Sequence, residues 1–277
     1  MICMKKIIFY ILLLFTLFIS LFLISMLMKS PSLDRDWTLD QKLLPYSIFS
    51  EEEIHIYNIR NITYRNTSDY DVYHYNKTVN ISEIQSLYYF VEDLGMFPGF
   101  SHTMLSFGFK NGDYIAFSVE IRKKKGDVYG PIKGLFRTYE LMYVIADERD
   151  VINLRANYRN STVYSYPINI SNENLEKLFI SMLERTNNLN KTPEFYNTLT
   201  STCTTNLVEH ANLIENHIFF KYHPYILLPG FSDKLLLKRN LINSDIDNIK
   251  DLRNEFKIND KAKKAKYYPN FSKIIRS

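Results

Sequence analysis

The chain has 277 residues, of which 46% are hydrophobic and 23% charged, with only 8 Gly and 9 Pro. This composition excludes a disordered chain and a fibrous protein. The 34 basic and 30 acidic residues give a net charge of +4, which is too balanced for a protein that binds nucleic acid over its whole surface. Roughly 250 residues lie beyond the apolar N-terminal segment, enough for one domain with a full core.

The N-terminal segment is apolar and long. Residues 7–28 contain neither a charge nor a proline, and such a helix can cross a hydrocarbon layer of about 30 Å. Lys5 and Lys6 precede it, so the positive-inside rule keeps the N-terminus in the cytoplasm and exports residues 30–277. A cleaved signal peptide is the alternative. We expect an uncleaved anchor over residues 1–30, because the apolar run is too long for a signal peptide and residues 25–28 lack a small-residue cleavage site.

The remaining chain is expected to form one α+β domain over residues 31–256. Alternating polar and β-branched or aromatic residues predict strands within 37–75, at 102–109 and at 114–122, whereas helices are predicted at 135–147, at 172–189 and from Cys203 onward. Residues 257–277 hold seven basic residues and one acidic residue. This basic tail is expected to be either a solvated or disordered end, or a segment that binds anionic lipid headgroups.

A β-hairpin is predicted at residues 102–122, because Asn111 and Gly112 separate two strand patterns. The apolar faces of its strands match only if paired positions differ by an even number. That register places His102 and Glu120 on the same face of the sheet, as opposite or diagonal neighbours. The pair is then either a solvated cross-strand contact or a base oriented by a carboxylate.

Cys203 is the only cysteine beyond the apolar segment, since Cys3 precedes it. A thiol without a disulfide partner in an oxidising compartment is either buried or used in chemistry. Apolar residues follow Cys203 at helical spacing, which predicts that it lies at a helix N-terminus and faces inward; they are Leu207, Ala211, Ile214 and Ile218. Ser201 and Thr202 are typical capping residues.

Such a position favours the thiolate and provides amides that bind an oxyanion. His210 follows on nearly the same face but about 10 Å away, too far to act directly. His102, with Glu120 beside it, is therefore the best candidate for a base, and the other histidines lack such a setting: His55, His74, His217 and His223. Neither a metal nor a cofactor is expected, because metal-binding and nucleotide-binding motifs are absent from the sequence.

Several segments, in order along residues 50–240, resemble the Lnb N-terminal periplasmic domain family. They are IRN at 59–61, FSHTMLSFGF at 100–109, SVEIR at 118–122, YEL at 139–141, ADERD at 146–150, PEFYNTLT at 193–200, CTT at 203–205 and LPGFSD at 228–233. The resemblance implies a circularly permuted papain-like thiol fold, with an antiparallel sheet and packed helices. It also implies a lipoprotein N-acyltransferase, which moves an acyl chain from a phospholipid to the terminal amine of a lipoprotein.

Carried over to this chain, the resemblance makes Cys203 the nucleophile, His102 the general base and Glu120 the third polar group. Five neighbouring residues are expected to contact the substrate or the oxyanion: Ser101, Ser118, Arg122, Thr202 and Thr204. Thr202 departs from the family, which typically has Asn at that position, and the extra membrane helices of some members are missing here.

The resemblance thus implies an acyltransferase with a phospholipid donor and a lipoprotein acceptor, anchored by one helix in the inner membrane with its catalytic domain in the periplasm. It implies no nucleic-acid partner. Two other functions stay open on the residues alone. One is a cysteine amidase or peptidase that acts on cell-wall peptide, and the other is a non-enzymatic envelope binding domain with a buried Cys203.

Overall fold

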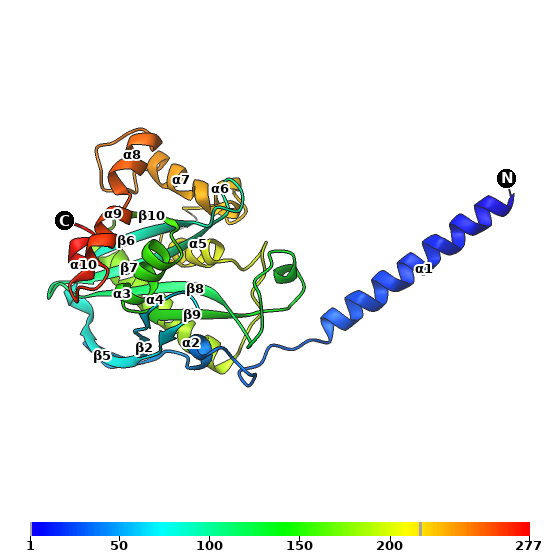
Figure 1. Cartoon of the computed structure of the whole chain (residues 1–277), viewed down its shortest axis with the longest axis horizontal. Coiled ribbons are helices and arrows are strands. Elements are labelled where there is room, and N and C mark those ends of the chain that lie inside the picture. The colour runs from blue at the N-terminus through cyan, green and yellow to red at the C-terminus, as the bar shows by residue number, and fades with distance from the viewer. Residues whose placement is uncertain (1, 216–217) are drawn as a thin grey trace.

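The computed structural model describes residues 2–215 and 218–277. It contains a mixed sheet with helices on both faces, and a long helix, α1 (Ile2–Leu27), that extends away from it (Figure 1). Residues 5–27 of α1 form a helix that is long and apolar enough to cross a membrane. This agrees with the expected N-terminal helix. His217, predicted above to have no role in a site, lies outside the described residues.

The sheet consists of two antiparallel blocks. The first block holds β1 (Tyr46–Phe49), β2 (Glu53–Arg60) and β5 (His74–Asn80), and β2 pairs with both of its neighbours. The second has the order β9-β8-β7-β6-β10, with strands β9 (Glu140–Ala146), β8 (Tyr114–Arg122), β7 (Ser101–Phe109), β6 (Ile84–Asp93) and β10 (Thr162–Pro167). A single parallel pair, Arg60 with Ala146, joins β2 to β9. A separate two-stranded ribbon is formed by β3 (Thr63–Tyr64) and β4 (Tyr70–Asp71).

One face of the sheet packs against α4 (Asn172–Lys191) and α5 (Cys203–Ile214). The Phe179 ring of α4 meets the edges of Phe107 and Phe117, with ring centroids 5.0 and 5.7 Å apart, a favourable edge-to-face geometry. Further helices follow α5: α6 (Pro224–Leu227), the short η4 (Pro229–Phe231), α7 (Ser232–Lys238) and α8 (Ile249–Phe256). Ser171 caps α4 by accepting the amide of Asn174.

The opposite face of the sheet packs against α3 (Glu148–Asn153), the π-helical turn η3 (Leu154–Tyr158), α9 (Asn259–Ala265) and α10 (Phe271–Ile274). Buried residues of the last two helices include Ala262, Ala265 and Phe271, and Arg276 binds the buried carboxylate of Glu148 at 2.5 Å. Residues 257–277 are therefore not a solvated or disordered end, because they cover a face of the sheet. They lie at the end of the domain away from α1 (Figure 1).

The hairpin prediction is confirmed. β7 and β8 pair in the expected register, Phe107 with Ile115 and Leu105 with Phe117. Gly112 closes the three-residue loop at φ +84°, a backbone conformation that glycine adopts without steric cost. The even register holds His102 and Glu120 on one face of the sheet.

The predicted helix at 135–147 is wrong. Residues 133–135 form a short 3-10 turn, η2, and residues 140–146 form the strand β9. All seven residues of β9 are buried, because helices cover both faces of the sheet there. A strand buried on both faces loses the alternating pattern that marks a half-exposed strand, so its continuous apolar run could not be distinguished from a helix. The remaining short elements are α2 (Leu39–Lys42) and η1 (Ile81–Glu83).

Candidate functional site

The candidate site lies where the two central strands of the second block separate. The β7–β8 pairs end at Met104 with Ser118, whereas β6 stays paired with β7 as far as Ser101, and β8 stays paired with β9 as far as Arg122. The first turn of α5 packs over β7 at this end, with the Thr204 and Thr103 hydroxyls 2.9 Å apart. Groups from both faces of the sheet can therefore meet at the separation.

Cys203 is the first residue of α5, as predicted. Thr202 caps the helix: its hydroxyl accepts the amide of Thr205, and the Thr205 side chain binds the Thr202 backbone in return. The first amides of a helix have no partner within the helix, and Thr202 takes only that of Thr205. The amides of Cys203 and Thr204 have no hydrogen-bond partner among the described residues, so the first turn of α5 can offer them to an oxyanion.

The Cys203 thiol is acidic. Burial alone would raise its pKa, but the charge and hydrogen bonding of His102 outweigh burial, and the pKa falls to about 6. The Thr103 amide and the Thr204 hydroxyl, whose Oγ1 is 3.6 Å from Sγ, lower the pKa further. A thiol in this environment is largely ionised at neutral pH, which is what a nucleophile requires.

His102 is held by a chain of hydrogen bonds rather than by Glu120 directly. Its Nε2 lies 2.7 Å from the Ser118 hydroxyl, and that hydroxyl donates to Glu120 Oε1 at 2.8 Å. Since Ser118 gives its only proton to the carboxylate, it must accept from His102, so Nε2 carries the ring proton. The Nδ1 atom is then free of a proton in the neutral ring and can accept one from the thiol.

Glu120 stays ionised, as this chain requires. Burial would raise the pKa of its carboxyl group, but the positive charges of Arg155 and Arg60 outweigh burial, and His102 and the Ser118 hydroxyl add to their effect. The pKa therefore falls well below its usual range. Arg155 Nη2 lies 2.7 Å from Glu120 Oε1.

The sequence reasoning missed Arg155 and Glu92. Arg155 comes from η3 and is buried between two carboxylates, because its Nε also lies 2.8 Å from Glu92 Oε2. Glu92 lies on β6 directly across from His102. The sequence contains no local signal that brings η3 to β6 and β8. The π-helical turn that carries Arg155 is a rare conformation that often marks functional sites.

The other predicted residues separate into two groups. Ser101 and Thr202 line the same cavity as Cys203 and His102, whereas Ser118 is the link to Glu120 described above. Arg122 does not reach the site: its guanidinium donates to the carbonyls of Gln41 and Lys42 and lies over the ring of Trp37. The prediction that Arg122 contacts the substrate or the oxyanion is therefore wrong. Its guanidinium instead holds the N-terminal segment against β8.

His210, which is predicted to lie too far from Cys203 to act directly, belongs to a structural network. Its ring nitrogens lie 2.9 Å from the Tyr143 hydroxyl and 2.7 Å from the Ser181 hydroxyl. Burial lowers its pKa to about 4, so the ring is neutral at pH 7. The Ile59-Arg60-Asn61 and 146–150 segments are structural too, since Arg60 forms a buried ion pair with Asp150 at 2.8 Å.

The cavity around Cys203 has a volume of about 380 Å³, within the usual range for ligand sites. Its lining includes the polar side chains of His102, Glu120 and Arg155. Many of the other lining side chains are apolar and come from several loops and the end of α6: Leu94, Phe97, Phe100, Tyr129, Pro131, Leu199, Leu227 and Leu228. The cavity thus combines a reactive group with space for an apolar ligand.

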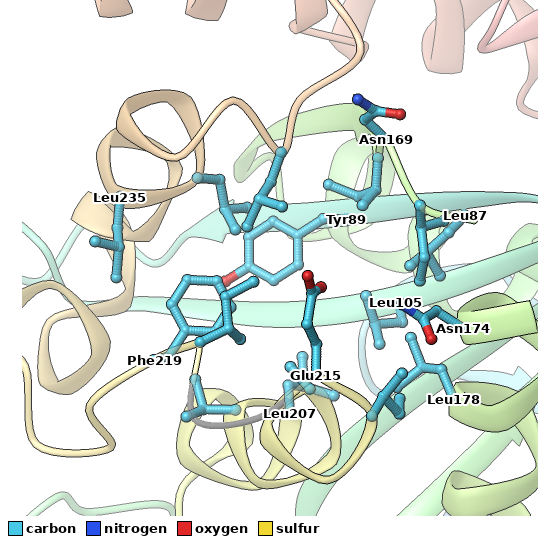
Figure 2. A pocket seen from close by; sticks show the side chains of 18 of the residues that line it. Leu87, Tyr89, Leu105, Asn169, Asn174, Leu178, Leu207, Glu215, Phe219 and Leu235 are labelled. Carbon is cyan, nitrogen blue, oxygen red and sulfur yellow. The ribbon is translucent and has the colours of Figure 1, made fainter.

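A second cavity of about 360 Å³ lies between α5, α7 and the sheet. Figure 2 shows the side chains of Tyr89 and Glu215 pointing into it, among aliphatic side chains such as Leu207 and Leu235. Thr204 lines this cavity, and its hydroxyl contacts both Thr103 and the Cys203 sulfur. Cys203 and His102 themselves line the first cavity, which is therefore the candidate active site.

Comparison of the sequence with models of known protein families identifies the family of this chain. The model of the Lnb N-terminal periplasmic domain matches residues 71–229, more than half of the chain. The chain belongs to the Lnb N-terminal periplasmic domain family. The matched region contains Cys203, His102, Ser118, Glu120 and Arg155, and it confirms the resemblance identified from the sequence.

Membership of the Lnb N-terminal domain family, together with the apolar helix α1, indicates an envelope-associated protein. Among the described residues, α1 is the one helix long and apolar enough to span a membrane. No curated protein and no solved structure matches the chain. Within residues 2–215 and 218–277, no group of three or more His, Cys, Asp or Glu side chains is arranged to hold a metal ion.

Proposed function

We propose that the protein is a thiol acyltransferase of the bacterial envelope, which moves an acyl chain from a phospholipid to the terminal amine of a lipoprotein through a thioester on Cys203. We further propose that α1 anchors it in the inner membrane with the catalytic domain in the periplasm. The observation that carries the proposal is the acidic Cys203 thiol beside His102 in a cavity with apolar walls. Family membership supports it.

In the first half of the reaction, the Cys203 thiolate attacks the ester carbonyl and the amides of Cys203 and Thr204 hold the oxyanion. The C–O bond then breaks, and the protonated Nδ1 of His102 gives its proton to the departing alcohol of the lysophospholipid. Throughout this step Nε2 stays bonded to Ser118. The carboxylate of Glu120 stabilises the imidazolium through that hydroxyl.

In the second half, the neutral amine of the acceptor attacks the thioester carbonyl while Nδ1 of His102 removes a proton from it. The C–S bond breaks, an amide forms and the Cys203 thiolate returns beside the imidazolium. Such a cycle requires that the first product leave before the acceptor reacts. It therefore predicts ping-pong kinetics.

We also propose that the fold is the circularly permuted papain-like arrangement that the resemblance implies. The order of the elements supports it, because the strand with His102 precedes the helix with Cys203, and the helix N-terminus lies against that strand. Ser118 and Glu120 together then provide the polar group behind the histidine.

The decisive experiment measures the mass of the Cys203 adduct after incubation with a phospholipid of defined acyl chains. We expect the mass of the protein to increase by that of one acyl group, as a thioester on Cys203 requires. This increase should be absent from Cys203→Ala. An adduct that forms with a peptide substrate but not with phospholipid would favour the cysteine amidase alternative. A thiol that reacts slowly with iodoacetamide, both with and without His102, would favour a non-enzymatic binding domain.

A further inference from the structure

Large apolar side chains that are exposed to solvent lie on three loops that contribute residues to the lining of the Cys203 cavity. They come from three loops that lie before β7, between β8 and β9, and before α5. Their exposed fractions are 58% and 47% for Met96 and Phe97, 74% and 73% for Val128 and Ile132, and 55% for Leu199. We call these five residues the apolar rim. An exposed apolar cluster beside a cavity marks an interaction surface.

The rim is continuous with the interior of the cavity. Phe97 and Leu199 belong to both, because they are exposed at the mouth and also line the cavity with Cys203. Pro131, next to Ile132, lines the cavity as well. An apolar ligand could therefore pass from the rim to the thiol along an apolar wall, without crossing a polar barrier.

The two loops beside the thiol are tied together. The Thr198 hydroxyl donates to the carbonyl of Pro131 at 2.7 Å, and the Thr198 amide donates to the carbonyl of Gly134. Gly134 has no room for a side chain, because a Cβ atom there would lie 2.3 Å from Thr198 Oγ1. The loop between β8 and β9 is thus held at a fixed position relative to the segment that leads into Cys203.

The same loop contacts the end of α1. The Phe22 ring packs edge-on against Phe136 with centroids 5.3 Å apart, and Arg137 donates to the carbonyl of Leu27. Phe22 lies five residues before Leu27, which is about 7.5 Å along a helix. Phe136 therefore lies alongside the apolar part of α1, and the loop lies at the end of the domain nearest α1 (Figure 1).

The charge around the rim suits an anionic surface. Residues 123–138 carry one acidic side chain, Asp127, and five basic ones: Lys123, Lys124, Lys125, Lys133 and Arg137. Lys125 is paired with Asp36 and Lys123 lines the cavity, which leaves Lys124, Lys133 and Arg137 for the surface. Lys29 adds a further positive charge at the end of α1, where its Nζ reaches the carbonyl of Phe136. Basic residues beside exposed apolar ones are the pattern of segments that bind anionic lipid headgroups and insert apolar side chains below them.

We infer that the apolar rim is inserted into the surface of the membrane that holds α1, so that the cavity opens into the lipid. The partner is the bilayer itself, with anionic phospholipid headgroups held by the basic residues of the loop. The inference rests on the proposed function, because an acyl chain must reach Cys203 if the protein is an acyltransferase. It deepens that function by assigning the rim as the entrance for lipid.

Insertion is tested by fluorescence quenching in the full chain, reconstituted in vesicles of phosphatidylethanolamine and phosphatidylglycerol with brominated acyl chains. Cys203→Ala serves as the background, so that the lipids stay intact. Ile132→Trp places a probe in the rim, and Tyr267→Trp places a matched probe at a residue that is 80% exposed near the C-terminus. The signal of the native Trp37 is subtracted.

We expect the fluorescence of the Ile132→Trp probe to fall by about half or more in brominated vesicles, since inserted side chains reach the acyl boundary. The Tyr267→Trp probe should be unaffected. Equal quenching of the two probes, or none at Ile132→Trp, overturns the inference. The result does not depend on activity, so a quenched rim probe would keep the inference even if the wild-type chain formed no acyl thioester on Cys203. The missing thioester would refute only the proposed acyltransferase.

A second measurement links the rim to lipid access. The double variant Val128→Asp, Ile132→Asp should transfer acyl chains from vesicles at a rate about tenfold lower or more, because charged side chains resist entry into the bilayer. Its hydrolysis of the soluble ester p-nitrophenyl butyrate should stay at the wild-type level. The control is Tyr267→Asp, Tyr268→Asp, which should change neither rate. Unchanged transfer from vesicles by the rim variant would overturn the inference.

Discussion

Ser118→Ala is the sharpest test of the hydrogen-bond chain behind Cys203. The substitution removes the hydroxyl that accepts the proton of His102 Nε2 and donates to Glu120, both at 2.7–2.8 Å. The imidazole then loses both its fixed orientation and its preference for the tautomer with a free Nδ1. A hydrogen bond to a charged group contributes about 1.5–3 kcal/mol, so kcat/KM should fall roughly 10- to 150-fold.

The assay follows acyl transfer from phospholipid to a diacylated lipopeptide, with the pH profile of Cys203 alkylation as a second readout. The matched control is Ser106→Ala, since Ser106 is also a fully buried serine whose side chain lies on the same face of the hairpin. It should retain wild-type kcat/KM. Ser118→Ala should also shift the onset of alkylation to higher pH, because the imidazolium that lowers the pKa of the thiol is less stabilised.

Two results would refute this reasoning. If Ser118→Ala kept kcat/KM within about twofold of the wild type, the hydroxyl would not position the base. If Ser106→Ala lost as much activity as Ser118→Ala, the loss would reflect the packing of the sheet and not the orientation of His102.

Three other predictions concern single groups. Cys203→Ala and His102→Ala should each abolish most acyl transfer in the lipopeptide assay. The double variant should lose little more activity than either single variant, because the effects of residues that act as a unit are strongly non-additive. Glu120→Gln should reduce acyl transfer less than either. Alkylation of Cys203 by iodoacetamide should reach half its maximal rate near pH 6, the value to which the pKa is lowered, and His102→Ala should move that midpoint toward the value of about 8.5 for a free thiol. Burial lowers the pKa of His210 to about 4, so the unfolded state binds a proton at a higher pH than the folded state. The free energy of unfolding should therefore fall by up to about 3 kcal/mol between pH 6.5 and pH 4. Urea titrations should show a smaller fall for His210→Gln.

The sequence predicted those parts of the fold and the site that depend on local patterns. The hairpin register followed from alternation and an Asn-Gly turn, so His102 and Glu120 were placed on one face correctly. The helix stripe placed Cys203 at an inward-facing N-terminus. In both cases a few neighbouring residues determine the geometry, which is why single-sequence reasoning was sufficient.

The rest depends on contacts between distant segments. Arg155 and Glu92 meet only because η3 packs beneath β6 and β8, and a buried ion pair leaves no periodic pattern in the sequence. β9 is covered by helices on both sides, which removes the alternation that would have identified it. The composition of the basic tail predicts either a solvated end or a lipid-binding segment, because its charges outnumber the few small and aromatic residues that it buries, among them Ala262 and Phe271.

The division of the sheet into two blocks has a consequence for how the domain opens and assembles. β1, β2 and β5 end at residue 80, so this block can form before the strands of the second block have been synthesised. Its ladder joins the second block through one pair, Arg60 with Ala146, reinforced by the bond of Arg60 to Asp150. Ile54, Ile56 and Ile59 of the first block share the core with β7 and β8, but a block joined through one ladder pair should open at a lower free energy than the central strands. Amides of β2 and β5 should therefore exchange their hydrogens before those of β7 and β8, and the strands that hold the thiol site should be the last to unfold.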